Sequence, residues 1–192
     1  MTSPASPTPN AQRIVIAIDG PAASGKSSTA HRVAERLHFR HIDSGALYRA
    51  ATAAALNRAS DPASWTAELV LSAAHAVTLA ATDCSFVPHF NQAQMEGELR
   101  RAEVTANVSQ VAQMQPVRDW VNALVKEVAS RYDVVVDGRD MGTNVFPNAD
   151  IKIYLVADPW ERARRRLIQR VQRSPTDEEI AAETDRLVRR DA

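Results

Sequence analysis

The sequence lacks the features that mark secreted, membrane and disulfide-rich proteins. Its 192 residues include one cysteine, Cys84, so no disulfide can form within the chain, which fits a reducing compartment. No apolar run approaches the roughly 18 residues that a membrane span needs. The first 13 residues, MTSPASPTPNAQR, lack the apolar stretch of a signal peptide and have the composition of a disordered tail. These absences predict a soluble cytoplasmic protein.

An excess of charge of one sign is also absent, because 23 basic and 23 acidic residues give a formal net charge of zero. This balance argues against a general binder of nucleic acid or of a membrane surface. Basic residues are nevertheless concentrated in 162–173, RARRRLIQRVQR, which indicates a local anion site. The five histidines show no spacing typical of metal ligands, so we expect surface or packing roles for them.

Strands and helices alternate along the chain, which predicts an α/β domain with a parallel sheet. Apolar runs at 14–18, 132–137 and 151–157 are typical of strands buried on both faces. FRHID, at 39–43, predicts a further short strand. In the middle of the chain the segments AVTLA, SFVPHF and AQM are short and broken, which indicates small antiparallel strands.

Helical periodicity fills most of the remaining chain. The predicted helices cover 27–37, 44–59, 61–75, 103–112, 116–131, 160–173 and 176–190. Ser44 and Asp61 are suitable N-caps for two of them. Thr176 and Glu179 have the spacing of a capping box at the start of the last helix.

The loop after the first strand has the chemistry of a phosphate site. Residues 20–27, GPAASGKS, fit G-x-x-x-x-G-K-[ST] between a buried strand and a helix start. Glycines let backbone N–H groups close around phosphate oxygens, Lys26 can reach the β and γ phosphates, and Ser27 can offer its hydroxyl to Mg²⁺. The positive end of the following helix points at the same anion. The candidate nucleotide-binding residues are Gly20, Pro21, Ala22, Ala23, Ser24, Gly25, Lys26, Ser27 and Ser28.

A P-loop specifies a nucleoside triphosphate but not an activity, since GTPases, ATPase motors and small-molecule kinases share it. The sequence has no NKxD-type stretch that would read guanine, and it is short for a motor. These observations favour a small-molecule kinase.

Four further stretches resemble bacterial cytidylate kinases, which are P-loop nucleoside monophosphate kinases. They are DSGALYR at 43–49, SQVAQMQPVR at 109–118, DGRDMGT at 137–143 and GTNVFPNADIKIYLVADPWERARRR at 142–166. With the P-loop, the resemblance runs from Ile14 to Asp191. It implies transfer of the γ-phosphoryl group of ATP to CMP or dCMP in pyrimidine nucleotide metabolism. It further implies Mg²⁺ as cofactor and a monomer whose partners are small molecules, not nucleic acid or membrane.

The resemblance also implies the family's fold and domain organisation. We expect a parallel sheet of order 2-3-1-4-5 with helices on both faces, a small antiparallel insert that binds the monophosphate, and a short lid. The expected divisions are a tail at 1–13 and one kinase domain at 14–192, with its core at 14–60 and 104–157, the insert at about 61–103 and the lid at about 158–177.

Site residues follow from the matched motifs. The resemblance implies catalytic roles for Lys26, Asp137, Arg139 and Arg165, Mg²⁺ contacts for Ser27 and Asp137, and donor contacts from the lid residues Arg162, Arg165 and Arg166. On the acceptor side it implies Ser44, Arg49, Ser109, Arg118, Arg139, Asp140 and Arg190. Guanidinium groups suit this role because their planar fork matches phosphate oxygens at two points. Closure of the lid would exclude water, so that phosphate is not lost to hydrolysis.

Taken singly, several of these residues also fit plainer roles. Arg49 and Arg118 are compatible with solvated arginines on helices, Ser44 with a helix cap, and Asp137 and Asp140 with turn residues. For Arg164 and Arg170 the solvated role is the one we expect.

Two positions depart from the family pattern. Asn91-Gln92 stands where the family has Asn-Gly, so we expect a longer loop or a strained turn. The family continues RDxxDxxR into a last strand and helix, whereas this sequence ends VRRDA. We therefore expect a truncated sequence whose sheet lacks its fifth strand and exposes an apolar edge beside 151–157. A kinase for another small acceptor, or an inactive nucleotide-binding fragment, are the alternatives that this ending leaves open.

Overall fold

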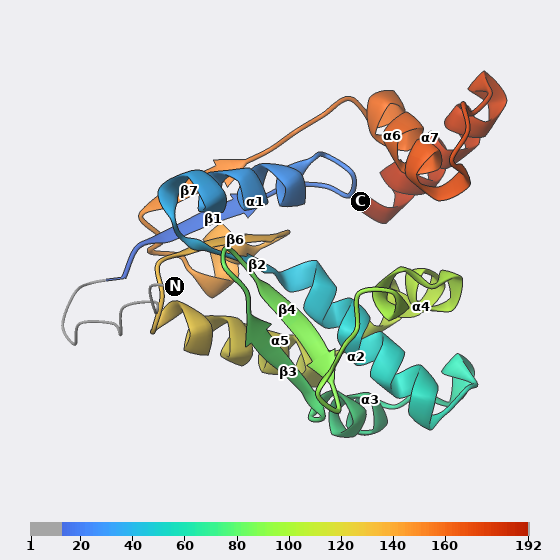
Figure 1. Cartoon of the computed structure of the whole chain (residues 1–192). Coiled ribbons are helices and arrows are strands. Elements are labelled where there is room, and N and C mark those ends of the chain that lie inside the picture. The colour runs from blue at the N-terminus through green and yellow to red at the C-terminus, as the bar shows by residue number, and fades with distance from the viewer. Residues whose placement is uncertain (1–12, 192) are drawn as a thin grey trace.

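A four-stranded parallel sheet lies at the centre of the computed structural model, which describes residues 13–191 (Figure 1). Its strands are β1 (Val15–Asp19), β2 (Arg40–Asp43), β6 (Val134–Gly138) and β7 (Ile151–Tyr154), in the order β2-β6-β1-β7. Counted along the chain within this sheet, the order is 2-3-1-4, which confirms the predicted arrangement for these strands. The α/β fold of P-loop nucleoside-phosphate kinases is therefore confirmed.

Helices cover both faces of this sheet (Figure 1). The α-helices are α1 (Lys26–Leu37), α2 (Ser44–Arg58), α3 (Ala67–Ala74), α4 (Ala102–Gln113), α5 (Gln115–Ala129), α6 (Pro159–Val171) and α7 (Asp177–Asp191). Ile16 and Ile18 pack against α1, whereas Ala17 and Val136 pack against α5 on the opposite face. Successive strand residues point to opposite faces, so a sheet covered on both sides requires continuous apolar strands.

A second, antiparallel sheet lies beside α2 (Figure 1). It consists of β3 (Val77–Ala81), β4 (Phe86–Phe90) and β5 (Ala93–Gln94) in that order, which confirms the small antiparallel strands. Phe90 pairs with Ala93, so Asn91 and Gln92 form a two-residue hairpin loop. Both residues have positive φ, 49° and 67°. Of the two expected alternatives, the structure therefore contains the strained turn and not the longer loop. The division of the chain into core, insert and lid stays a prediction.

Two details of the predicted helices are wrong. The helix expected over 61–75 is a short 3₁₀ turn, η1 (Pro62–Ser64), followed by α3. Trp65 breaks it: its buried indole donates to the Ala59 carbonyl at 2.9 Å, and its backbone is extended. Thr66 then caps α3 by accepting from the Leu69 amide. At the start of α2 the cap is Asp43, not Ser44, because the Asp43 carboxylate accepts from the Ala46 amide.

Strand β7 also differs from the prediction of a strand buried on both faces. Ile151 and Ile153 are 49% and 41% exposed, and Tyr154 is exposed as well. β7 pairs with β1 alone among the described strands and forms the sheet edge. The apolar run alone indicated a strand and not what covers it, whereas the departure from the family pattern predicted an exposed apolar edge beside 151–157, and the structure contains this edge.

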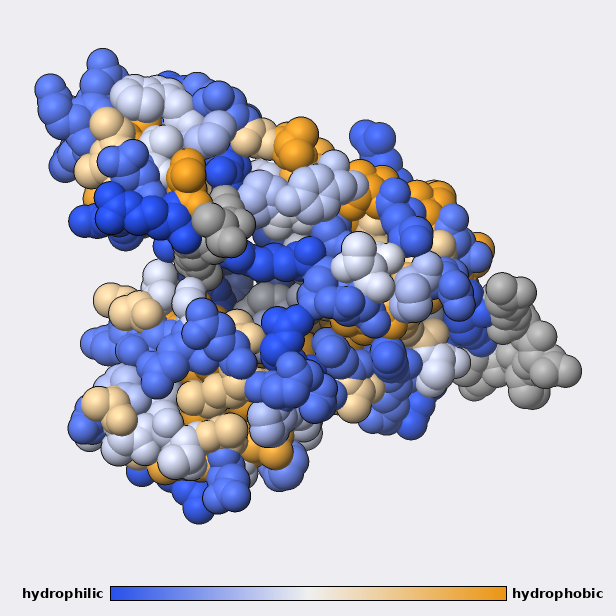
Figure 2. Space-filling model, turned by 180° about the vertical axis from the view of Figure 1, so that it is seen from behind, coloured by the Kyte–Doolittle hydropathy of each residue, from blue (hydrophilic) through white to orange (hydrophobic). Residues whose placement is uncertain are grey.

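Helices α6 and α7 form a hairpin set apart from the sheet, beyond the P-loop (Figure 1). They have a core of their own, made of Ala163, Leu167, Ile180 and Leu187, against which Ala22 of the P-loop packs. The predicted capping box begins α7: Thr176 and Glu179 exchange hydrogen bonds between side chain and backbone amide in both directions. The face of the molecule shown in Figure 2 has a cleft between this hairpin and the region formed by α2, α3 and α4. Hydrophilic side chains line this cleft.

Candidate active site

Three neighbouring strands carry an aspartate at or next to their carboxyl ends. These are Asp19 on β1, Asp43 on β2 and Asp137 on β6. The parallel register pairs Asp43 with Asp137 and Asp19 with Gly138, so the three aspartates lie together at the carboxyl end of the sheet. Ligands of open α/β sheets bind at the carboxyl ends of the strands.

Asp137 is the most enclosed of the three, with 1% of its surface exposed. Its Oδ2 accepts from the Ser27 hydroxyl at 2.7 Å, and its Oδ1 lies 2.7 Å from His41 Nε2. The Ser44 hydroxyl donates to the backbone carbonyl of Asp137 at 2.8 Å. Because the Ser44 hydroxyl proton is engaged in this hydrogen bond, the Ser44 Oγ can only accept a hydrogen bond from a ligand. These bonds fix the carboxylate beside the first turn of α1.

The environment of Asp43 raises the pKa of its side-chain carboxyl group toward neutral pH. Burial raises the pKa of Asp43 to about 6, and the Asp137 carboxylate adds to the rise. His41, the Ala46 amide and Lys26 act in the opposite direction. Perturbed carboxyl groups of this kind are typical of functional sites.

The P-loop has the backbone that a phosphate cradle needs. Gly25 has φ of 95°, a conformation that other residues rarely adopt. At Gly20 a Cβ would lie 2.3 Å from the Leu155 carbonyl oxygen, so only glycine fits there. The Ser24 hydroxyl is buried and has no hydrogen-bond partner among the described residues. A buried hydroxyl donor of this kind inside the loop is suited to bind an anion. The Lys26 ammonium lies beside the same loop, 3.3 Å from the Pro21 carbonyl oxygen.

The donor set near the loop also fits Mg²⁺. Ser27 and Asp137 present adjacent oxygens, the ligand type that Mg²⁺ prefers. Within residues 13–191 no group of three or more His, Cys, Asp or Glu side chains is arranged to hold a metal ion. Mg²⁺ usually keeps several waters and takes only one or two protein ligands beside phosphate oxygens.

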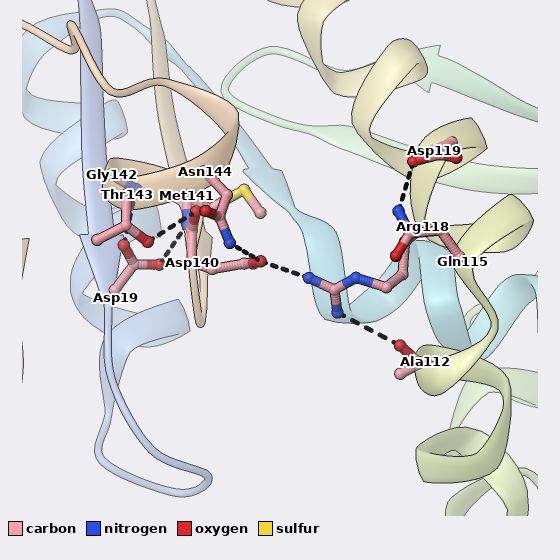
Figure 3. A network of polar contacts seen from close by, with 10 residues as sticks. All are labelled: Asp19, Ala112, Gln115, Arg118, Asp119, Asp140, Met141, Gly142, Thr143 and Asn144. Atoms are coloured by element: carbon pink, nitrogen blue, oxygen red, sulfur yellow. Dashed lines mark hydrogen bonds and ion pairs between the residues drawn. The ribbon is translucent and has the colours of Figure 1, made fainter.

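The segment after β6 is held by Asp19 (Figure 3). Both carboxylate oxygens of Asp19 accept backbone hydrogen bonds, from Met141 at 2.9 Å and from Gly142 at 2.8 Å. Asp19 is 6% exposed, so these bonds are dry and strong. They fix the single π-turn η3 (Met141–Val145) and with it the position of Arg139 and Asp140 just before it.

Asp140 and Arg118 link this segment to α5 (Figure 3). An Arg118 Nη2 lies 2.5 Å from Asp140 Oδ2, and Asn144 donates to the same oxygen at 3.0 Å. The other Nη of Arg118 donates to the Ala112 carbonyl at the end of α4. The pair thus joins two segments that the sequence analysis placed on the acceptor side. Ser109 lies half-buried on α4.

Arg49 projects from α2 toward the start of α4. Its Nη1 donates to the Leu99 carbonyl at 3.1 Å and to the Thr105 hydroxyl at 3.0 Å. Burial lowers the pKa of Arg49, the Asp43 carboxylate opposes the shift, and the charges of Arg166 and Arg100 add to it. Arg139 is exposed at the end of β6.

The predicted lid arginines differ widely in exposure. Arg162 is buried and its Nη1 donates to the Ala22 carbonyl of the P-loop at 3.1 Å. Arg166 is half-buried, whereas Arg165 is exposed. Arg164, expected to be solvated, is exposed beside Glu161. The side chain of Arg190 and the tail at 1–12 lie outside the described residues.

Sequence reasoning missed three residues of this site. Asp19 and Asp43 could have been found, because an acid at the end of each of three predicted parallel strands is a local signal. His41 was expected at the surface or in packing, yet it is 8% exposed and contacts Asp137. No local pattern predicts that contact, because 96 positions separate the two residues.

In the part of the chain that the structure describes, no helix combines the length and the apolar character needed to cross a membrane.

Comparison with known proteins identifies the family. A family model described as cytidylate kinase matches residues 16–192. A cytidylate kinase of Pelodictyon phaeoclathratiforme is 41% identical over 163 residues, which are 81% of this chain and 67% of that protein. One of Shouchella clausii is 40% identical over 84% of this chain and 72% of its own length, and one of Chloroherpeton thalassium is 37% identical over 90% and 74%. The chain therefore belongs to the cytidylate kinase family.

Proposed function

We propose that the protein transfers the γ-phosphoryl group of ATP to CMP or dCMP, which gives CDP or dCDP and ADP. The observation that carries this proposal is the family match over residues 16–192, with relatives named cytidylate kinase. The geometry supports it, since the P-loop, the helix that carries Arg49 and the segment bound by Arg118 follow β1, β2 and β6, which are three neighbouring parallel strands. The cytoplasmic location and the monomeric state stay predictions from the sequence.

On the donor side, the P-loop amides and Ser24 hydroxyl hold the β and γ phosphates. Lys26 neutralises the charge that develops on the transferred group, which is the main demand of phosphoryl transfer. Mg²⁺, when bound, supplies further charge neutralisation between the phosphates. Ser27 and Asp137 would hold it, Asp137 directly or through water, and His41 keeps the Asp137 carboxylate oriented.

On the acceptor side, Arg49 and Arg139 hold the α-phosphate of CMP through their guanidinium groups. Arg118 and Ser109 donate hydrogen bonds to the cytosine edge, and Asp140 keeps the Arg118 guanidinium in place. A site built on such donors rejects bases that leave its buried polar groups unpaired. Ser44 lies next to Asp137 and offers its oxygen as an acceptor.

The lid arginines Arg162, Arg165 and Arg166 close over the donor phosphates. Arg162 already contacts the P-loop at Ala22, so the hairpin of α6 and α7 is attached where the donor binds. Closing the cleft excludes water, so the phosphoryl group passes to CMP and not to solvent.

A coupled ADP-release assay with CMP, dCMP, UMP and AMP tests the proposal. CMP or dCMP is expected to be the best acceptor, and a preference for AMP would show that the acceptor is wrong. Lys26→Ala is expected to lower kcat by a factor on the order of 10²–10³, the usual cost of removing one preorganised charge donor. Its melting temperature should stay close to that of the parent, and an unchanged kcat would exclude the proposed role of Lys26.

A further inference from the structure

The hairpin of α6 and α7 contains a carboxylate that the proposed reaction does not use. Glu183, on α7, is 3% exposed, which is rare for a glutamate. Arginines from both helices surround it: Arg166 Nε lies 3.0 Å from Oε1, and an Nη1 of Arg170 and of Arg186 lies 3.5 Å from Oε2. A buried carboxylate persists only with such partners, so this group of side chains is built around Glu183.

The three arginines are not equivalent. The side chains of Arg170 and Arg186 are 52% and 71% exposed, whereas that of Arg166 is 23% exposed. An ion pair with an exposed arginine restrains the arginine little, because water screens its charge and its side chain stays mobile. The contact with Arg166 is also the shortest. Glu183 therefore restrains Arg166 more than it restrains the other two.

Arg166 lies on the side of α6 that faces the cleft. It follows Arg162 by four residues, so both lie on one face of the helix, and Arg162 contacts the P-loop carbonyl of Ala22. From the other side of the cleft, Arg49 is close enough for the charge of Arg166 to add to the lowering of its pKa, of which burial is the main cause. Guanidinium groups on the two sides of the cleft provide positive charge for an anion that binds between them.

We propose that Glu183 is a positioning residue for Arg166 in the phosphoryl transfer proposed above. Glu183 holds the guanidinium at its Nε edge, so the edge formed by the two Nη atoms can meet phosphate oxygens of ATP. A long arginine side chain loses rotamer freedom when it binds a ligand. Because the contact with Glu183 restricts Arg166 before ATP arrives, less of that freedom is lost during the reaction.

A double-mutant cycle tests whether Glu183 acts through Arg166. Glu183→Gln, Arg166→Ala and the double variant are compared in the ADP-release assay at saturating CMP and varied ATP. Glu183→Gln is expected to lower kcat/KM for ATP on the order of tenfold, since small misplacements of a phosphate-binding group are costly. The KM for CMP should not change. In the Arg166→Ala background the same substitution should have no further effect.

Glu179→Gln is the matched control. Glu179 forms an ion pair with Arg173 at the turn of the same hairpin, is half-buried, and remains a suitable capping residue as glutamine. It should leave kcat/KM for ATP unchanged. A Glu183→Gln protein as active as the parent overturns the proposal. So does an equal loss in both Arg166 backgrounds, which is what a purely structural role would give.

Two further measurements keep the result interpretable. If melting curves show that Glu183→Gln does not fold, the cycle is run with Glu183→Asp, which keeps the charge but is one methylene short of Arg166. The affinity for a non-hydrolysable ATP analogue, measured by calorimetry, separates this proposal from the proposed function. Weaker binding in Glu183→Gln only when Arg166 is present supports positioning even if CMP proves not to be the acceptor. Unchanged binding and turnover refute it.

Discussion

Replacing Gln92 by glycine is expected to stabilise the protein. Asn91 and Gln92 close the β4–β5 hairpin with φ of 49° and 67°. Two positive φ angles in a two-residue loop are typical of a type I′ turn, for which Asn-Gly is the preferred sequence. Asparagine tolerates this conformation, but glutamine has no local hydrogen bond that compensates for it. Gln92 is exposed, so removing its side chain uncovers no core.

The size of the gain follows from two opposing terms. The left-handed conformation costs an L-residue about 1–2 kcal/mol. Glycine in its turn loses about 0.5–1 kcal/mol more conformational entropy on folding. The net gain in the free energy of unfolding is about 0.5–1 kcal/mol, which corresponds to a rise in Tm of about 1–4 °C for a chain of this size.

Thermal unfolding followed by circular dichroism measures this shift. Asn91→Gly is the matched control, because it changes the adjacent position of the same turn where the native residue already suits positive φ. Its Tm should change less than that of Gln92→Gly. A Gln92→Gly protein that melts at or below the temperature of the parent would refute the strain argument, as would an equal gain from Asn91→Gly.

Three other outcomes follow from buried groups. Leu47→Ala, at a fully buried position in the core between the sheet and α5, should cost about 2–5 kcal/mol of unfolding free energy in urea titrations; a cost below 1 kcal/mol would contradict close packing of Leu47 in that core. Asp19→Asn leaves an amide group opposite one of two buried N–H donors, so stability should fall by about 1–3 kcal/mol and kcat should fall with it; an unchanged kcat would show that the segment carrying Arg139 is not held by Asp19. Because the folded pKa of Asp43, about 6, exceeds its ordinary value of 3.8, ionisation of this group disfavours the fold and stability should decline as pH rises from about 4 to 6. Asp43→Asn keeps the helix cap and should remove this decline, with a gain of up to about 3 kcal/mol at pH 7; a difference between parent and variant that does not vary with pH in denaturant titrations would contradict it.

Much of the fold could be read from the sequence because its signals are local. The P-loop, the apolar strands and the capping box of Thr176 and Glu179 each depend on residues a few positions apart, and the structure contains all of them. The order of the parallel strands came from resemblance to a family, and the structure agrees with it. Residue types at fixed short spacing therefore predicted most of the strands and helices and the loop before α1, whereas the strand order needed the resemblance, and the roles of the site residues stay predictions.

Tertiary structure alone decided which side chains meet. His41 lies beside Asp137 across 96 positions, and Asp19 reaches the Met141 amide across 122. The break at Trp65 arises because its indole is buried against Ala59, which helical spacing could not reveal. Glu183 looked like one acid on a charged helix, yet it is buried among arginines from two helices. Periodicity in sequence describes one element at a time, whereas burial and pairing depend on what the other elements place against it.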